Sequence, residues 1–352
     1  MTETADARRL LWADVAKGAC IVLVVLHHVV GKVAVQALDA AGLSVAADAW
    51  EQLTLLLKPL RMPLFFLVSG VFAAGAVRRP WRASRARLAG GYYLYVVWLL
   101  VYVAFYAVET ASPANRTTSV RELLGDLVWA ETSMWFLQAL VLYFVVARLV
   151  RRLPVLPVLA VAAALSAASG AVGIEENNKV AVLAHLVYFL VGALLPEVVR
   201  RAAATSRPSW RLAAAYVVLG LAAVHLPLPW TVGSLLASAA GLPLGVALAV
   251  RLARTGLADP LAWLGRRTLH VYVLHLVVLL SLVPLLGPLL ATGAPTAVLV
   301  LAPVWLTALV AAGSLALGAL LERSPLRSLL VPPAVVTGRR TTPARERVSR
   351  SA

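Results

Sequence analysis

Residues 15–35 read VAKGACIVLVVLHHVVGKVAV, and this run establishes the class of protein. About 20 predominantly apolar residues are enough for one helix to cross a bilayer, so the run predicts a transmembrane helix. A cleavable signal peptide would carry a short apolar core followed by a small-residue cleavage site. The run has no such site, and we expect it to be a retained span.

Composition extends this interpretation to the whole chain. Of the 352 residues, 61% are hydrophobic and 14% are charged, with a mean hydropathy of +0.86, whereas soluble domains carry about 25% charged residues. The net charge of +16 is divided among short arginine clusters between apolar runs. This pattern indicates topology-setting charge and contact with anionic membrane lipid, and no nucleic-acid partner is expected. The single cysteine, Cys20, excludes an internal disulfide and a cysteine-ligated metal site, and no metal is expected.

The same length criterion applied along the chain predicts an all-α, polytopic membrane protein of about ten transmembrane helices. The predicted segments are 15–35, 57–77, 88–109, 134–150, 153–171, 180–199, 210–227, 230–250, 267–287 and 295–321. The connections between them are short, the longest outer ones being 36–56 and 110–133. We therefore expect one transmembrane domain over 1–330 and a disordered, basic cytoplasmic tail over 331–352.

The loop charges fix the expected orientation. When loops are assigned alternately to the inside and the outside, all but six of the 32 Lys and Arg residues fall inside. The six are Lys32, Lys58, Arg61, Arg116, Arg121 and Lys179. An excess of basic residues marks cytoplasmic loops, so both termini are predicted to be cytoplasmic. High Ala, Val, Leu and Arg usage is typical of a high-GC bacterial genome, and we expect a multi-pass protein of the bacterial cell membrane.

Ionisable residues inside spans are costly and are functional candidates, and the first span carries a group of them. At about 100° per residue, Asp14, Lys17 and His28 share one helix face, with a rise of about 16 Å from Lys17 to His28. His27 is displaced by about 80° from Lys17 and is expected to point elsewhere. A cation near the inner surface and a deep histidine suit a donor with a charged head and a reactive tail. The alternative is that Asp14 and Lys17 anchor the helix end and His28 is a packing residue.

Two other spans carry candidates. Arg61 begins the second span on its outer side, the same half as His28, where a lone arginine either faces the interior or extends to the interface. Tyr272 and His275 lie three residues apart in the ninth span and are expected to form one polar patch in mid-membrane.

These segments together resemble the acyltransferase-3 family of integral membrane acyltransferases, which includes bacterial O-acetylases of cell-surface polysaccharides. The family pattern of a basic residue, ten residues and a histidine fits Lys17 and His28. Residues 62–70 (MPLFFLVSG), 135–137 (WFL) and 268–275 (TLHVYVLH) are similar to three further family segments in the same order. The chain departs in having Lys at 17, where many members have Arg, and Arg61 where many have His. His27 also takes a position that is often Gly, so it stays an alternative to His28.

The resemblance implies acyl transfer, usually of acetyl, from cytoplasmic acetyl-CoA to a hydroxyl of a carbohydrate or glycosylated acceptor. Lys17, with Asp14 beside it, is then the donor-binding group, Lys17 contacting the phosphates of coenzyme A. His28 is the general base, and Arg61 or Tyr272 stabilises the oxyanion, with His275 in the same patch. The residues leave open whether transfer is direct or passes through an acyl-histidine. They also leave open a multi-pass transporter or exporter of a glycan or lipid, and a scaffold without chemistry.

Overall fold

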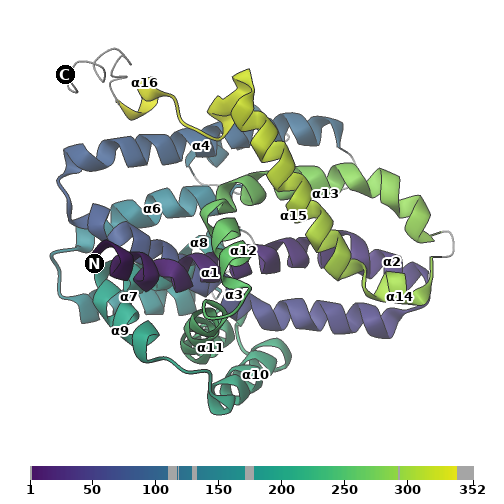
Figure 1. Ribbon diagram of the computed structural model, residues 1–352, viewed down its shortest axis with the longest axis horizontal. Helices are drawn as coiled ribbons and strands as arrows, with labels where there is room; N and C mark the ends of the chain where they lie inside the picture. The colour runs from purple at the N-terminus through teal and green to yellow at the C-terminus, as the bar shows by residue number, and fades with distance from the viewer. Residues whose placement is uncertain are drawn as a thin grey trace.

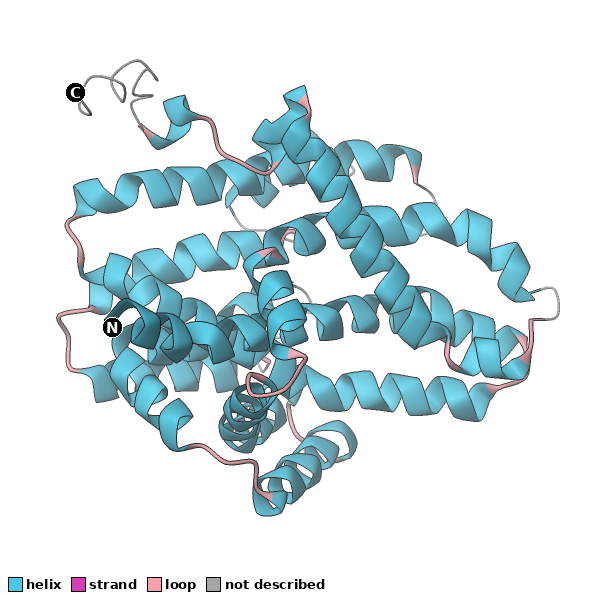
Figure 2. Ribbon diagram, viewed as in Figure 1, coloured by secondary structure: helices cyan, strands magenta, loops and turns pink. Residues whose placement is uncertain are grey.

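The computed structural model describes residues 2–109, 117, 119–128, 133–170, 178–291 and 294–338. These residues form helices joined by short loops, and no strand occurs among them (Figure 2). The α-helices (Figure 1) are α1 Thr2–Val29, α2 Val35–Ala40, α3 Ser44–Arg78, α4 Trp81–Val108, α5 Val120–Val128, α6 Trp135–Val150, α7 Val155–Ala168, α8 Asn178–Leu194, α9 Pro196–Thr205, α10 Trp210–His225, α11 Trp230–Leu252, α12 Ala258–Arg266, α13 Thr268–Ala291, α14 Thr296–Val300, α15 Ala302–Arg323 and α16 Ala334–Thr337. A π-helix, η1 (Val30–Ala34), joins α1 to α2, and a 3-10 helix, η2 (Pro325–Leu329), follows α15.

The prediction of an all-α membrane protein is confirmed. In the described part of the chain, six helices are long and apolar enough to cross a membrane, and the bent pair α8–α9 makes a seventh if it is one span. The shorter apolar helices α6, α7 and α10 occupy the other three predicted segments. They have 16, 14 and 16 residues, slightly short of a full crossing. The number ten therefore stays a prediction.

Two predicted boundaries are wrong. The expected outer loop 36–56 is largely helical, because α2 continues the first span and α3 already begins at Ser44. This extension packs on the late helices, where Trp50 Nε1 donates to the carbonyl of Val300 at 2.9 Å. The predicted segment 180–199 is divided at Leu195 by a bend of 84°. Pro196 begins α9, a position where its missing N–H costs nothing.

Pairs of glycines bring helices into backbone contact. A Cβ placed on Gly18 of α1 would lie 2.0 Å from the carbonyl oxygen of Leu261, and one on Gly265 of α12 would lie 1.9 Å from that of Asp14. At the α3–α8 crossing, a Cβ on Gly70 would lie 2.2 Å from the Phe189 oxygen. Gly70, the last residue of the segment 62–70, thus lets α3 approach α8 closely, and α1 makes a comparable crossing with α12 that the sequence did not predict.

The middle of α3 is stabilised from outside the helix. Pro59 and Pro63 both lie within α3, and Pro63 leaves the Pro59 carbonyl without its helical donor. The buried hydroxyl of Ser238 on α11 donates to that carbonyl at 2.7 Å. A neighbouring helix therefore compensates for the proline, and α3 continues through it.

The end of α3 is capped by Arg148 of α6 and by Arg151, the residue directly after α6. Arg148 donates to the carbonyls of Ala76 at 2.8 Å and Arg79 at 2.7 Å, and Arg151 donates to that of Val77 at 2.8 Å. Arg148 is only 3% exposed, so this residue, counted in the sequence as an inner-loop charge, instead satisfies the free carbonyls of a helix end.

The beginning of α1 and the helix α16 lie at the same side of the bundle, at the left in Figure 1. An even number of crossings requires this arrangement, while the cytoplasmic orientation stays a prediction. Of the predicted tail, residues 331–338 include α16. Residues 339–352, like half of the predicted outer segment 110–133, lie outside the described residues.

Candidate active site

One face of α1 lines two cavities in succession. Asp14 and Lys17 line a cavity of about 470 Å³, and His28 lines another of about 310 Å³. We call them the inner and the outer cavity, after the predicted orientation. Ile21 and Val24, at the helical spacing between them, also line the outer cavity. The predicted shared face therefore exists, and it connects the two cavities. His27 lines the outer cavity as well, so the expectation that it points elsewhere is wrong. The outer cavity is wide enough for both His27 and His28 to line it.

Three cations and one carboxylate, Asp14, line the inner cavity. Besides Lys17 it is lined by Arg87 of α4 and Arg266 of α12, two residues that the sequence showed only as inner-side charge. Arg266 Nη1 lies 3.7 Å from Asp14 Oδ2, and the Gly18–Gly265 crossing places it there. Lys17 and Arg87 sit against aromatic faces, their charged groups 5.2 Å and 5.1 Å from the ring centroids of Phe72 and Phe144. The net positive charge suits a phosphorylated ligand.

The outer cavity brings His28 of α1 beside His275 of α13. Their ring centroids are 5.0 Å apart, and those of His27 and His28 are 5.3 Å apart. The π-helix η1 begins two residues after His28, and such wide turns are frequent at functional sites. The structure thus unites the deep histidine of the first span with the polar patch of the ninth.

The hydrogen bonds of His275 define its tautomer. Its Nδ1 lies 2.7 Å from the carbonyl oxygen of Tyr272 and 3.1 Å from that of Val271. Carbonyls only accept, so Nδ1 carries the hydrogen and Nε2 of the neutral ring keeps a lone pair. That buried Nε2 has no hydrogen-bond partner among the described residues. An unpaired buried acceptor is unfavourable, and this one lies in a ring that lines the outer cavity.

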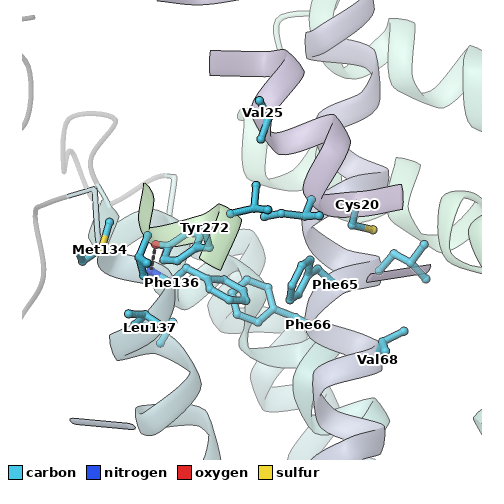
Figure 3. Packing of buried hydrophobic residues seen from close by; sticks show 14 of the residues in the cluster. Cys20, Val25, Phe65, Phe66, Val68, Met134, Phe136, Leu137 and Tyr272 are labelled. Carbon is cyan, nitrogen blue, oxygen red and sulfur yellow. Dashed lines mark hydrogen bonds between the residues drawn. The ribbon is translucent and has the colours of Figure 1, made fainter. Parts of the chain in front are cut away.

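Tyr272 fastens α13 to the first turn of α6. Its hydroxyl accepts from the backbone N–H of Phe136 at 3.2 Å and donates to the carbonyl of Ser133 at 2.9 Å. Figure 3 shows Tyr272 and Phe136 joined by the first of these bonds, with Phe65 and Phe66 reaching toward them from α3. The N–H of Phe136 is one of the free donors of a helix N-terminus. The tyrosine therefore has a structural role that the sequence did not indicate, and its only hydroxyl proton is already engaged.

Arg61 turns inward. It is 3% exposed, lines the outer cavity and donates Nη1 to the carbonyl of Thr54 at 3.0 Å. Of the two orientations open from the sequence, the interior one is present. The described lining of the outer cavity carries Arg61, Lys32 and Lys58 and no carboxylate side chain. A developing negative charge there would meet a positive field.

His185 of α8 is a candidate that the sequence reasoning missed. It lines the outer cavity, its Nδ1 lies 2.6 Å from the carbonyl oxygen of Ala181, and its ring lies 5.3 Å from that of Phe66. The signal was available, because a histidine within the predicted segment 180–199 meets the criterion that selected His28.

Comparison with known proteins gives one family and one curated relative. The model of a family described as an acyltransferase domain matches residues 10–323. The inner membrane protein YcfT of Escherichia coli is 28% identical over 162 residues, which cover 41% of this chain and 44% of that protein. The chain thus spans less than half the length of this relative. No solved structure matches the chain.

Proposed function

Because the chain belongs to the acyltransferase-3 family of membrane acyltransferases, we propose that it transfers an acyl group, acetyl, from cytoplasmic acyl-CoA to a hydroxyl of a carbohydrate-type acceptor, with His28 as general base. The observation that carries this proposal is the face of α1 that lines both cavities. Lys17 on this face lies in a cationic inner cavity, and His28 lies in an outer cavity with a second histidine.

The donor belongs in the inner cavity. Lys17, Arg87 and Arg266 bind the phosphates of coenzyme A, and Asp14 holds Arg266 in place through their ion pair. Asp14 is therefore a positioning residue for the donor site. The pantetheine arm extends along α1 over the rise of about 16 Å from Lys17 to His28.

The chemistry belongs in the outer cavity. His28 takes the proton of the acceptor hydroxyl while the oxygen attacks the thioester carbonyl carbon. The carbon–sulfur bond breaks, an ester forms, and the proton passes from His28 to the coenzyme A thiolate, so atoms and charge balance. His275 has its ring beside that of His28 and keeps an unpaired lone pair on Nε2, so in this mechanism it orients the base when the ring of His28 turns its N–H toward that lone pair.

Arg61 stabilises the oxyanion of this addition. Its guanidinium is buried at the same cavity, and a preorganised cation in a dry site stabilises developing charge more strongly than one in water. Tyr272 is the weaker candidate, because its proton is donated to the Ser133 carbonyl.

The test uses the full-length protein in nanodiscs, with acetyl-CoA and cell-envelope glycans from a strain lacking the gene. Coenzyme A thiol release and acetyl esters on the glycans, detected by mass spectrometry, are measured together for the wild type and His28→Ala. We expect both products from the wild type and ~10²–10⁴-fold slower formation of both by the variant, with equal amounts of folded protein. Acetylation by His28→Ala at the wild-type rate would contradict the proposal. A wild type that releases no thiol from any acyl-CoA would instead favour the transporter interpretation.

A further inference from the structure

The two cavities meet at a group of aromatic side chains. Among the described residues, three line both of them: Phe65 of α3, Phe136 of α6 and Tyr272 of α13. The ring centroids of Phe65 and Phe136 are 4.9 Å apart in an edge-to-face arrangement, and those of Phe136 and Tyr272 are 5.1 Å apart. We call these three rings the aromatic partition. It separates the cations of the inner cavity from the histidines of the outer one.

Hydrogen bonds hold two of the three rings of the partition at α6, whereas the third is held by packing. Tyr272 is hydrogen-bonded to both Phe136 and Ser133, so two of the three rings are tied to the first turn of α6. Phe65 closes the partition from α3 by packing alone, two residues after Pro63. All three side chains are less than 10% exposed. The fold therefore fixes the positions of the three rings, and the rings determine how wide the opening between the two cavities is.

The charge on the donor's phosphates determines which part of the donor reaches the partition first. The phosphates of the donor stay with Lys17, Arg87 and Arg266, because moving them into the apolar interior would be costly. The thioester carbonyl must nevertheless reach the side of His28. The free end of the acyl chain leads the donor and enters the partition first. The rings thus contact the acyl group before the reacting carbon arrives.

We propose that the aromatic partition sets the length of the acyl group, admitting acetyl and excluding longer acyl chains from the cavity of His28. This inference rests on the proposed function. One additional methylene in a fitted apolar pocket changes discrimination by about 10- to 200-fold. The outer cavity, at about 310 Å³, must also hold the acceptor, so an acyl chain that passes the rings occupies space that the acceptor needs.

Two neighbouring residues of α3 provide a matched test. Phe65 lines both cavities, whereas Phe66 is fully buried against Trp135, Phe136 and Tyr143 and lines neither. Phe65→Ala and the milder Phe65→Leu open the partition. Phe66→Leu removes the same ring one position away and serves as the control for altered packing.

The experiment measures thiol release in nanodiscs with acetyl-CoA, butyryl-CoA and octanoyl-CoA, using envelope glycans as acceptor. We expect Phe65→Ala to raise the ratio of butyryl to acetyl kcat/KM at least tenfold, Phe65→Leu to raise it less, and Phe66→Leu to leave it unchanged. An unchanged ratio in an active Phe65→Leu protein, or an equal shift in Phe66→Leu, would overturn this inference and leave the proposed function standing. A wild type without thiol release from any donor would overturn the proposed function and the inference with it.

Discussion

The imidazole rings of His28 and His275 lie with their centroids 5.0 Å apart, although they come from the first and the ninth predicted spans. The carbonyls beside Nδ1 of His275 leave its Nε2 as a buried acceptor without a partner among the described residues. The pair therefore combines a ring available to act as base with a ring fixed in one tautomer, as a base and its orienting group require.

Replacing His28 with Ala is expected to lower kcat for acetyl transfer by ~10²–10⁴-fold, the usual contribution of a positioned general base. His275→Gln is expected to cost less, because it removes only the orienting group. Thiol release from acetyl-CoA is the measurement. His27→Ala serves as the control, since His27 lines the same cavity next to His28. A greater loss in His27→Ala than in His28→Ala would assign the base to the other histidine.

Arg61→Met is expected to lower kcat by ~10²–10³-fold with little change in the KM for acetyl-CoA, because the residue lies away from the cationic inner cavity and acts on the developing charge. Arg61→Lys should keep part of the wild-type rate, because lysine retains the positive charge but lacks the planar guanidinium group. Steady-state kinetics of both variants separates kcat from KM. A rise in KM at constant kcat would place Arg61 in ground-state binding instead.

Lys17→Gln and Arg266→Gln are each expected to raise the KM for acetyl-CoA roughly tenfold or more, the effect of losing a charge-assisted contact to phosphate. Arg200→Gln is the control, because Arg200 pairs with Glu197 on the exposed face of α9 and lines neither cavity. Titration of acetyl-CoA in nanodiscs gives the three KM values. A normal KM in both inner-cavity variants would remove the donor from this cavity.

Gly265→Ala is expected to reduce the yield of folded protein, since its Cβ would lie 1.9 Å from the backbone oxygen of Asp14 and would force α1 and α12 apart. Gly75→Ala is a matched control within α3, because nothing lies within 4 Å of its added methyl group. There the substitution should stabilise the helix by about 0.5–1 kcal/mol. Fluorescence-detected size exclusion measures the folded fraction. Equal folded fractions in the two variants would show that the α1–α12 crossing tolerates separation.

The sequence predicts the parts of this site that lie on one helix, but not the contacts between helices that are distant in the sequence. The stripe of Asp14, Lys17 and His28 follows from helical periodicity along one element, and both cavities are built on it. The partners of that stripe come from helices distant in sequence. Arg266 reaches Asp14 only because Gly18 and Gly265 let two backbones touch, and no local pattern indicates which glycines meet.

The burial of polar residues was likewise hard to predict from spacing. Arg148 belongs to an inner-loop cluster by the charge rule, yet it caps α3 in the interior. His185, by contrast, lies three residues before Tyr188, with ring centroids 6.0 Å apart and both residues lining the outer cavity. The spacing that selected Tyr272 and His275, and the cost of a histidine in a membrane, therefore both marked it. The family segments include Phe65, Phe136 and Tyr272, but they do not indicate that these rings separate two cavities.

Tyr272→Phe tests whether this tyrosine is structural or catalytic. Its hydroxyl satisfies the Phe136 N–H and the Ser133 carbonyl, so its removal leaves the first turn of α6 without a capping partner. We expect the thermal midpoint of the protein to fall, with a cost of about 0.5–2 kcal/mol as for the loss of a helix cap. The kcat for acetyl transfer should change far less than in Arg61→Met, because the phenol proton is not available to an oxyanion.

Differential scanning fluorimetry and thiol release on the same preparation give both quantities. A normal thermal midpoint with a ~10²-fold lower kcat would make Tyr272 an oxyanion donor and reduce the case for Arg61.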